Sequence, residues 1–529
     1  MTPKYLLKVK EHHVKRGDTL ESIAAEYGMT WKELAKFNWG TDDPEDVNKF
    51  LYGTVGCRSR TKDGKNFIFT DDDHKTGDGF VYVPVKADDK SYSTNSPTHV
   101  IDLKPFKRKL TVFSKCLVNF RTADNWEGSF GFDWIRAADT GRNGDVDYEK
   151  HVGSYGEVYA TNDNAVFTAE KAKYDDLKSR YYHPFEIVWK TNEDGKKYEN
   201  TSAWLSLFPE DQTQGDKNHK KCTAKLRLFY EIKDHAPDIL RFIYDKSLFK
   251  LNKEEVDDKG VRGYEKGMDV EITCIKEFSQ DQKIEVWVET IDKNGQYASY
   301  LAGRLMVMAN SKNKRCKANV VFVIIPTHIS VLPKLISRNR LGKEEEHLKK
   351  YLAQSLASTN VKVILAENLA VDELPPSKNK KWIIQDKKKQ NVIATSLKDG
   401  SRLLHFLERS FNKEYTEYKD WYKAFIFNER GGYYNGDDYR GLYGLANGIP
   451  ASSVVVFISD ELNNPLNIIT HELLHAMGLI HSFQNKDNYP KEAYTFQYEV
   501  TDNIMDYVDK ADALWKWQWD NLHKELKNE

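Results

Sequence analysis

One motif in the sequence fixes the relative placement of several side chains. Residues 471–481 read His-Glu-Leu-Leu-His-Ala-Met-Gly-Leu-Ile-His, with three histidines, one glutamate and one glycine at fixed spacings. Five specified residues at these spacings are expected by chance in about one of ten thousand chains of this length. An amphipathic helix with unrelated histidines is therefore much the weaker interpretation.

The spacing within the motif predicts a metal site. His471 and His475 are four residues apart, so both imidazoles project from one face of a helix. Gly478 favours a turn at a positive φ, which would return His481 to the first two histidines. Three neutral imidazoles leave the fourth position of a tetrahedral zinc ion to water, and Glu472 is placed beside that water as a general base. We therefore expect a catalytic Zn2+ site.

The motif and a feature about twenty residues downstream resemble the metzincin clan of zinc endopeptidases. Residues 503–507 read Asn-Ile-Met-Asp-Tyr. The resemblance implies that Met505 lies in a turn beneath the zinc site. It also implies that Tyr507 is a switchable zinc ligand that stabilises the transition state, and a packed core tyrosine is the alternative.

A glycine-containing string precedes the last apolar run before the motif. Gly444, Leu445 and Ala446 are similar to the metzincin edge strand, which pairs with extended substrate. A glycine-rich loop is an equal alternative for these three residues. The preceding residues, 430–443, contain glycines and four tyrosines, which suits either a flap over the site or a surface loop.

The rest of the C-terminal sequence predicts an α/β fold. Apolar runs at 319–325, 361–365 and 453–458 suit buried strands, and the segments between them place leucines at helical spacing. Alternation of strands and helices is typical of α/β domains. We assign residues 316–529 to a metzincin-like zinc peptidase domain.

The N-terminal residues carry a second pattern. Residues 13–39 predict a short strand and two capped helices, and this pattern resembles a LysM module. The resemblance implies a βααβ fold that binds N-acetylglucosamine glycans such as peptidoglycan. Its last strand is expected only after an insertion at 41–78, so the LysM-like module spans 1–86. Because the insertion alters a groove-forming loop, docking to a protein such as a secretion-machine component is the alternative. The positions expected to make either contact are Asp18, Thr19, Leu20 and Asn38.

The middle of the chain predicts β structure without a catalytic group of residues. Residues 87–98 form a polar linker, and 99–218 form a β-rich region whose strands the sequence does not resolve. Residues 219–312 alternate apolar and polar side chains, which predicts an immunoglobulin-like β-sandwich. We expect this middle to be a spacer or a binding region.

Composition limits the partners and the location. The net charge of −1 gives no overall electrostatic field that would attract nucleic acid. The sequence also lacks an apolar run long enough to span a membrane. The five cysteines form no C-x-x-C pair that would indicate a structural zinc site. The N-terminus lacks a standard signal peptide, so we expect export by a non-classical or injection-type route, or otherwise a cytoplasmic location.

These patterns together predict a multidomain zinc endopeptidase that acts on a protein or peptide and is targeted by a LysM-like module. The arrangement suits a bacterial secreted effector, including one delivered by a contractile injection system. One alternative is a hydrolase of peptidoglycan peptides. Another is a non-enzymatic protein that binds the cell wall or docks to a partner.

Overall fold

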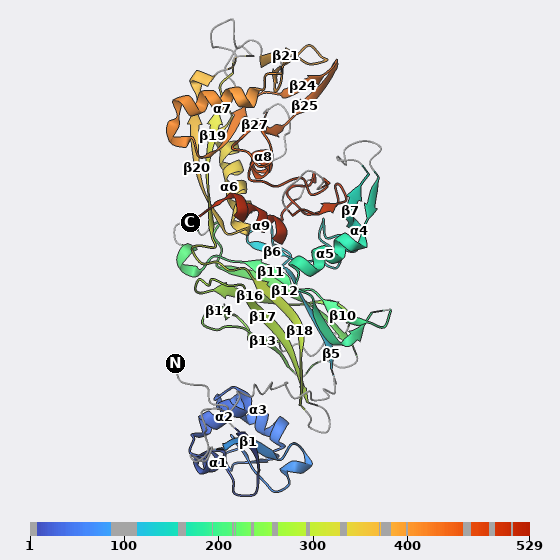
Figure 1. Cartoon of the computed structure of the whole chain (residues 1–529), viewed down its shortest axis with the longest axis vertical. Coiled ribbons are helices and arrows are strands. Elements are labelled where there is room, and N and C mark those ends of the chain that lie inside the picture. The colour runs from blue at the N-terminus through green and yellow to red at the C-terminus, as the bar shows by residue number, and fades with distance from the viewer. Residues whose placement is uncertain are drawn as a thin grey trace, which may run out of the picture.

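The computed structural model has an N-terminal module, a β-sheet region and an α/β region along its long axis (Figure 1). The predicted linker 87–98 lies outside the residues that the structure describes. Those residues are 8–85, 114–156, 166–192, 194–213, 216, 218–233, 237, 239–256, 263–291, 297–327, 329, 336–369, 371, 382–397, 400–458, 467–485, 492–508 and 511–529.

The N-terminal module has the expected order of strand, two helices and a delayed strand. Strand β1 (Lys8–His13) pairs antiparallel with β4 (Phe80–Val85), and α1 (Leu20–Glu26) and α2 (Trp31–Trp39) lie between them in the chain. Each helix begins with a threonine whose side chain accepts a hydrogen bond from a backbone N–H of the first turn. The insertion contributes α3 (Pro44–Phe50), the π-helical turn Leu51–Val55, β2 (Ser59–Arg60), β3 (Phe67–Ile68) and the 3-10 turn Asp73–Lys75.

Two sheets form the middle of the molecule. The first has the order β15-β13-β17-β18-β11-β6 and the second the order β14-β16-β12-β5. Their strands are β5 (Lys115–Thr122), β6 (Gly131–Asp133), β11 (Ala203–Ser206), β12 (Thr223–Lys233), β13 (Ile239–Ile243), β14 (Phe249–Leu251), β15 (Glu255–Val256), β16 (Gly263–Cys274), β17 (Gln282–Ile291) and β18 (Tyr297–Val307).

The sequence predicts a boundary at 218/219 in this middle, yet strands from both sides of that boundary share both sheets. Strand β5 pairs with β12, and β11 pairs with β6 and with β18. The burial pattern of β5 explains why its sequence did not indicate a strand: six of its eight residues are buried, so it lacks the alternation of a strand with one solvated face. Two further middle strands, β9 (Phe185–Thr191) and β10 (Lys197–Asn200), pair with each other.

A small subregion of the middle lies beside the C-terminal segment. It contains α4 (Tyr148–His151), β7 (Val152–Tyr155), β8 (Phe167–Ala169) and α5 (Lys171–Tyr181). Strand β7 pairs with β8 and also with β28 (Thr495–Phe496), which follows the histidine motif in the sequence. A three-stranded sheet thus joins segments more than 300 positions apart.

The C-terminal region is a sheet covered on both faces. Its order is β20-β19-β23-β27-β26, with neighbouring strands parallel except for β26, which is antiparallel to β27. Alternate residues of the central strands pack on two different sets of helices, with α6 and α8 on one face and α7 on the other. The main elements are β19 (Cys316–Ile324), α6 (Arg338–Gln354), β20 (Ala357–Leu365), α7 (Leu403–Glu414), β23 (Tyr422–Phe427), β26 (Gly444–Ala446), β27 (Ser453–Phe457), α8 (Ile468–Ala476), α9 (Lys516–Glu525) and β29 (Lys527–Asn528).

Residues 430–443 are neither an irregular flap nor an irregular loop. They contain a hairpin of β24 (Gly431–Asn435) and β25 (Asp438–Leu442), which extends a second sheet with β21 (Ile383–Gln385) and β22 (Asn391–Ala394). The described residues of this region also include the 3-10 turns Glu367–Leu369 and Thr416–Tyr418. Among the described residues, no helix combines the length and apolar character needed to cross a membrane.

Candidate metal centre

Helix α8 carries the first two histidines of the motif. It packs between β27 and α6, and Ile469, Leu473 and Leu474 are completely buried. Helix α8 begins at Ile468 and ends at Ala476. The ring centroids of His471 and His475 are 4.8 Å apart, as expected for residues one turn apart.

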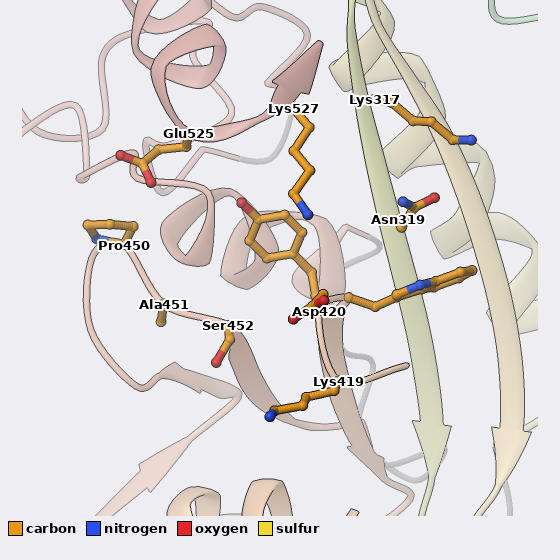
Figure 2. A pocket seen from close by; sticks show the side chains of 11 residues that line it. Lys317, Asn319, Lys419, Asp420, Pro450, Ala451, Ser452, Glu525 and Lys527 are labelled. Atoms are coloured by element: carbon orange, nitrogen blue, oxygen red, sulfur yellow. The ribbon is translucent and has the colours of Figure 1, made fainter. Parts of the chain in front are cut away.

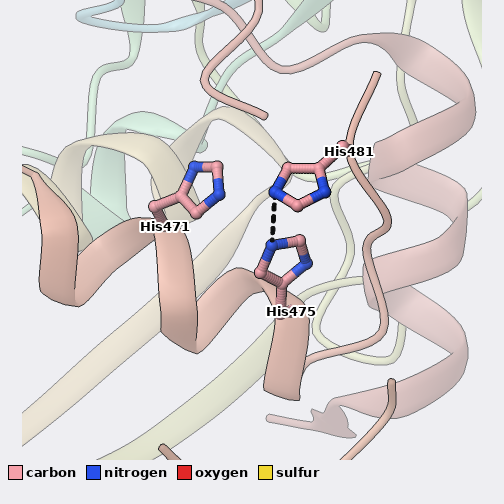
Figure 3. A group of neighbouring side chains, drawn as sticks. All are labelled: His471, His475 and His481. Atoms are coloured by element: carbon pink, nitrogen blue, oxygen red, sulfur yellow. Dashed lines mark hydrogen bonds between the residues drawn. The ribbon is translucent and has the colours of Figure 1, made fainter. Parts of the chain in front are cut away.

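The predicted turn brings the third histidine back to the helix. Gly478 has a φ of +90°, a left-handed conformation that glycine adopts without a side-chain clash. Figure 3 shows the three imidazoles facing one another, two from α8 and His481 from the segment that follows. One nitrogen from each ring lies within 4.8 Å of those of the other two, and the Nε2 atoms of His475 and His481 are 3.1 Å apart.

Backbone carbonyls orient the two helix histidines. The Nδ1 atom of His471 lies 3.0 Å from the carbonyl oxygen of Ile504, and that of His475 lies 2.7 Å from the carbonyl oxygen of Leu479. A ring that donates from Nδ1 leaves the Nε2 lone pair available, which is the usual outer contact of metal-binding histidines. Within the described part of the chain, Nε2 of His471 is buried and has no hydrogen-bond partner.

Burial keeps these imidazoles neutral. It lowers the pKa of His471 to about 4, and together with the neighbouring His471 it lowers the pKa of His475 to about 3. The pKa of His481 is also well below its ordinary value, because of burial and then of the other two histidines. Neutral imidazoles are the form that binds metal, and three of them suit a zinc ion with one open position. The donor set therefore fits zinc.

Glu472 lies on α8 under the edge strand β26. Burial raises the pKa of its carboxyl group to about 8. A Cβ atom at Gly444 would lie only 2.4 Å from Cγ of Glu472, so glycine at this position lets the strand approach the glutamate. The three residues of the predicted edge strand do form a strand at the edge of the sheet, where Leu445 is 39% exposed.

The segment after the third histidine supplies Met505 and Tyr507. Met505 is buried, its N–H donates to Oδ1 of Asn503, and its carbonyl oxygen accepts from the N–H of Ser482. The hydroxyl group of Tyr507 lies 3.0 Å from Nε2 of His481. Tyr507 is 48% exposed, so it is not a packed core tyrosine. Burial of its hydroxyl end, followed by the nearby Glu472, raises its pKa to about 12.

Sequence reasoning missed several residues that support this centre. Phe483 stacks on the ring of His481 with the centroids 4.8 Å apart, and Tyr498 packs edge-on against Phe483. The guanidinium group of Arg136, from the middle region, forms a buried ion pair of 2.8 Å with Asp502, three residues before Met505. Phe483 and Tyr498 lie outside the histidine motif, and Arg136 lies 366 positions from Asp502, so no short motif contains these residues.

A separate cavity of about 460 Å3 lies at the amino ends of β19, β23 and β27 (Figure 2). Lysines, acidic residues and aromatic rings line it, and none of the motif residues does. The lining residues are Lys317, Asn319, Lys419, Asp420, Trp421, Tyr422, Pro450, Ala451, Ser452, Glu525 and Lys527.

The N-terminal module has a recognisable family. Residues 12–48 match the LysM domain family. They form a LysM domain. No curated protein matches the chain.

The four positions singled out in the LysM domain lie in its framework. Thr19 caps α1, and Leu20 is buried in the core. The Asp18 carboxylate accepts a hydrogen bond from the N–H of Lys15. The side chain of Asn38 donates to the carbonyl oxygens of Leu34 and Tyr82 and accepts from the N–H of Tyr82, so it clamps α2 to β4. Their part in binding a glycan or a protein stays a prediction.

Proposed function

We propose that this protein is a zinc-dependent endopeptidase of the metzincin type, targeted by its LysM domain. The observation that supports this most directly is the convergence of His471, His475 and His481 beside Glu472. The three rings are neutral, and Nε2 of His471 is buried without a partner among the described residues. A purely structural zinc site is closed by four protein ligands and has no use for an adjacent base.

In this proposal His471, His475 and His481 would hold Zn2+. When bound, zinc supplies a Lewis acid that acidifies water and polarises a carbonyl group. Glu472 takes a proton from the attacking water and delivers it to the leaving amine, roles that suit a carboxyl group whose pKa lies near neutrality. The hydroxyl group of Tyr507, beside His481, donates a hydrogen bond to the oxygen that becomes negative.

Strand β26 offers a binding site for an extended peptide. Among the described strands it pairs only with β27, and its other side lies at the edge of the sheet. An extended chain adds to such an edge through backbone hydrogen bonds, which position a peptide without requiring a particular sequence. Because Gly444 lies against Glu472, a peptide on this edge would pass beside the general base.

A LysM domain that binds N-acetylglucosamine glycans would hold the protein at the cell wall. The peptides of peptidoglycan would then be the substrates closest to the zinc site. The same domain supports a second candidate function, a wall-binding protein without peptidase activity. A third use of the domain is docking to a protein, such as a component of a secretion machine.

The test compares the wild type with Glu472→Ala after both are shown to bind zinc. Each is incubated with a mixed proteome and with purified peptidoglycan, and mass spectrometry reads the products. New peptide termini made only by the wild type would support the peptidase and identify its substrate class. Equal zinc content, glycan binding and no product from either protein would favour the wall-binding function.

A further inference from the structure

The third histidine depends on a different kind of support from the first two. His471 and His475 lie on a buried helix, and each Nδ1 contacts a backbone carbonyl oxygen. His481 lies after the helix has ended, in a segment without regular structure. Its ring is packed by aromatic neighbours, with Phe483 stacked on it at an interplanar angle of 13° and Tyr507 edge-on at 78°.

A further aromatic residue, Tyr498, packs against Phe483. The ring of Tyr498 lies edge-on to Phe483 with the centroids 4.7 Å apart, and it also packs against Tyr507 at 6.0 Å. Tyr498 therefore contacts both of the aromatic rings that pack on His481.

Tyr155 of strand β7 fastens this segment at two points. Its hydroxyl oxygen accepts a hydrogen bond of 2.7 Å from the N–H of Tyr498. Its own N–H donates to Oδ1 of Asn485, and its carbonyl oxygen accepts from Nδ2 of Asn485, at 3.1 and 2.7 Å. The buried ring of Tyr155 is itself packed edge-on against Phe167 of β8.

We propose that Tyr155, from the middle region, is a positioning residue for the third metal ligand, His481. The inference rests on the proposed zinc site and deepens it: the site is completed by a residue more than 300 positions upstream. Contacts made directly to a metal-binding histidine typically contribute 10–100-fold to metal affinity, and because Tyr155 acts through Tyr498 and Phe483 we expect an effect at the lower end of that range. The middle region is then part of the metal centre rather than a spacer.

The test measures zinc affinity of the full chain by competition with a chelator. Tyr155→Phe keeps the ring and removes only the acceptor for Tyr498, so we expect about 10-fold weaker zinc binding. Tyr198→Phe is the matched control, because Tyr198 lies on β10, where a lysine packs over its ring. Its zinc affinity should equal that of the wild type.

A double-mutant cycle separates positioning from general stability. In a His481→Ala background, Tyr155→Phe should no longer change the residual metal affinity, because the ligand that it positions is gone. An equal loss of affinity in both backgrounds would overturn the proposal. The visible spectrum of the Co2+-loaded protein provides a second readout, and Tyr155→Phe should change its band intensities while Tyr198→Phe should not.

Failure of the inference can be told from failure of the proposed function. A wild type that binds no zinc overturns both. If the wild type binds zinc and cleaves peptides but Tyr155→Phe has the zinc affinity of the wild type, only the role of Tyr155 is overturned. If Tyr155→Phe does not fold, Asn485→Asp removes the donor to the carbonyl oxygen of Tyr155 and should weaken zinc binding in the same direction.

Discussion

Replacing Gly444 by alanine would place a methyl group against the side chain of Glu472. The new carbon would lie 2.4 Å from Cγ and 2.6 Å from Cδ of the glutamate, whereas ordinary contact begins near 3.4 Å. Either the carboxylate or strand β26 must therefore move by about 1 Å. A misplacement of about 1 Å at a catalytic group costs roughly 100-fold in rate, or about 2.7 kcal/mol in activation free energy.

The assay is kcat/KM on a peptide identified as a substrate of the wild type, with zinc content measured in parallel. We expect Gly444→Ala to lose about 100-fold in kcat/KM and to keep its zinc, because the three atoms nearest to the new carbon all belong to Glu472. Gly441→Ala is the matched control, since a Cβ atom there meets its nearest neighbour at 3.8 Å. Wild-type activity in Gly444→Ala would refute the placement of Glu472 as the base under this strand.

Three further substitutions test the packing around the site and in the LysM domain. Burial raises the pKa of Glu344 on α6 from its ordinary value of 4.5 to about 7. The fold therefore loses stability as the pH rises between these two values and stays at the lower level above pH 7. In urea unfolding, Glu344→Gln should be more stable than the wild type by up to about 3 kcal/mol at pH 8 and by little at pH 4. Arg136→Met leaves the buried carboxylates of Asp133 and Asp502 unpaired and should lower the free energy of unfolding by about 3–5 kcal/mol. Asn38→Ala removes the clamp between α2 and β4 and should destabilise the LysM domain by about 1–3 kcal/mol, measured by its thermal unfolding.

Each of these has a result that would contradict it. Arg180→Met removes a half-exposed pair and should change stability by less than about 1 kcal/mol, so an equal effect at Arg136 would argue against a buried ion pair there. For Glu344→Gln, a stability difference that does not change between pH 4 and pH 8 would show that the carboxyl group titrates normally. For Asn38→Ala, an unchanged midpoint would mean that β4 is held by its other contacts.

The sequence predicts the centre of the site well because its geometry is local. The four-residue spacing of His471 and His475 and the turn at Gly478 depend only on helix geometry and on the freedom of glycine. The strands at 319–325 and 453–458 also appear as β19 and β27, with small shifts in their ends.

Longer-range features could not be predicted in this way. Strand β23 was missed because Lys423 interrupts its apolar run. In the structure that lysine is completely buried, and its Nζ donates to the carbonyl oxygens of Lys419 and Trp421. The contact of Tyr155 with Tyr498 joins segments 343 positions apart, and neither residue belongs to a periodic pattern. A single continuous core likewise runs from the middle sheets to α9, although the sequence suggests separate units.

Zinc-edge X-ray absorption of the metal-loaded full chain, together with zinc content, tests the central claim most directly. We predict one zinc per chain, with three imidazole nitrogens at about 2.0–2.1 Å and one oxygen. His481→Ala should lose one imidazole from this shell. A protein that retains no zinc under metal-replete conditions, or a shell that contains sulfur, would contradict the proposed centre.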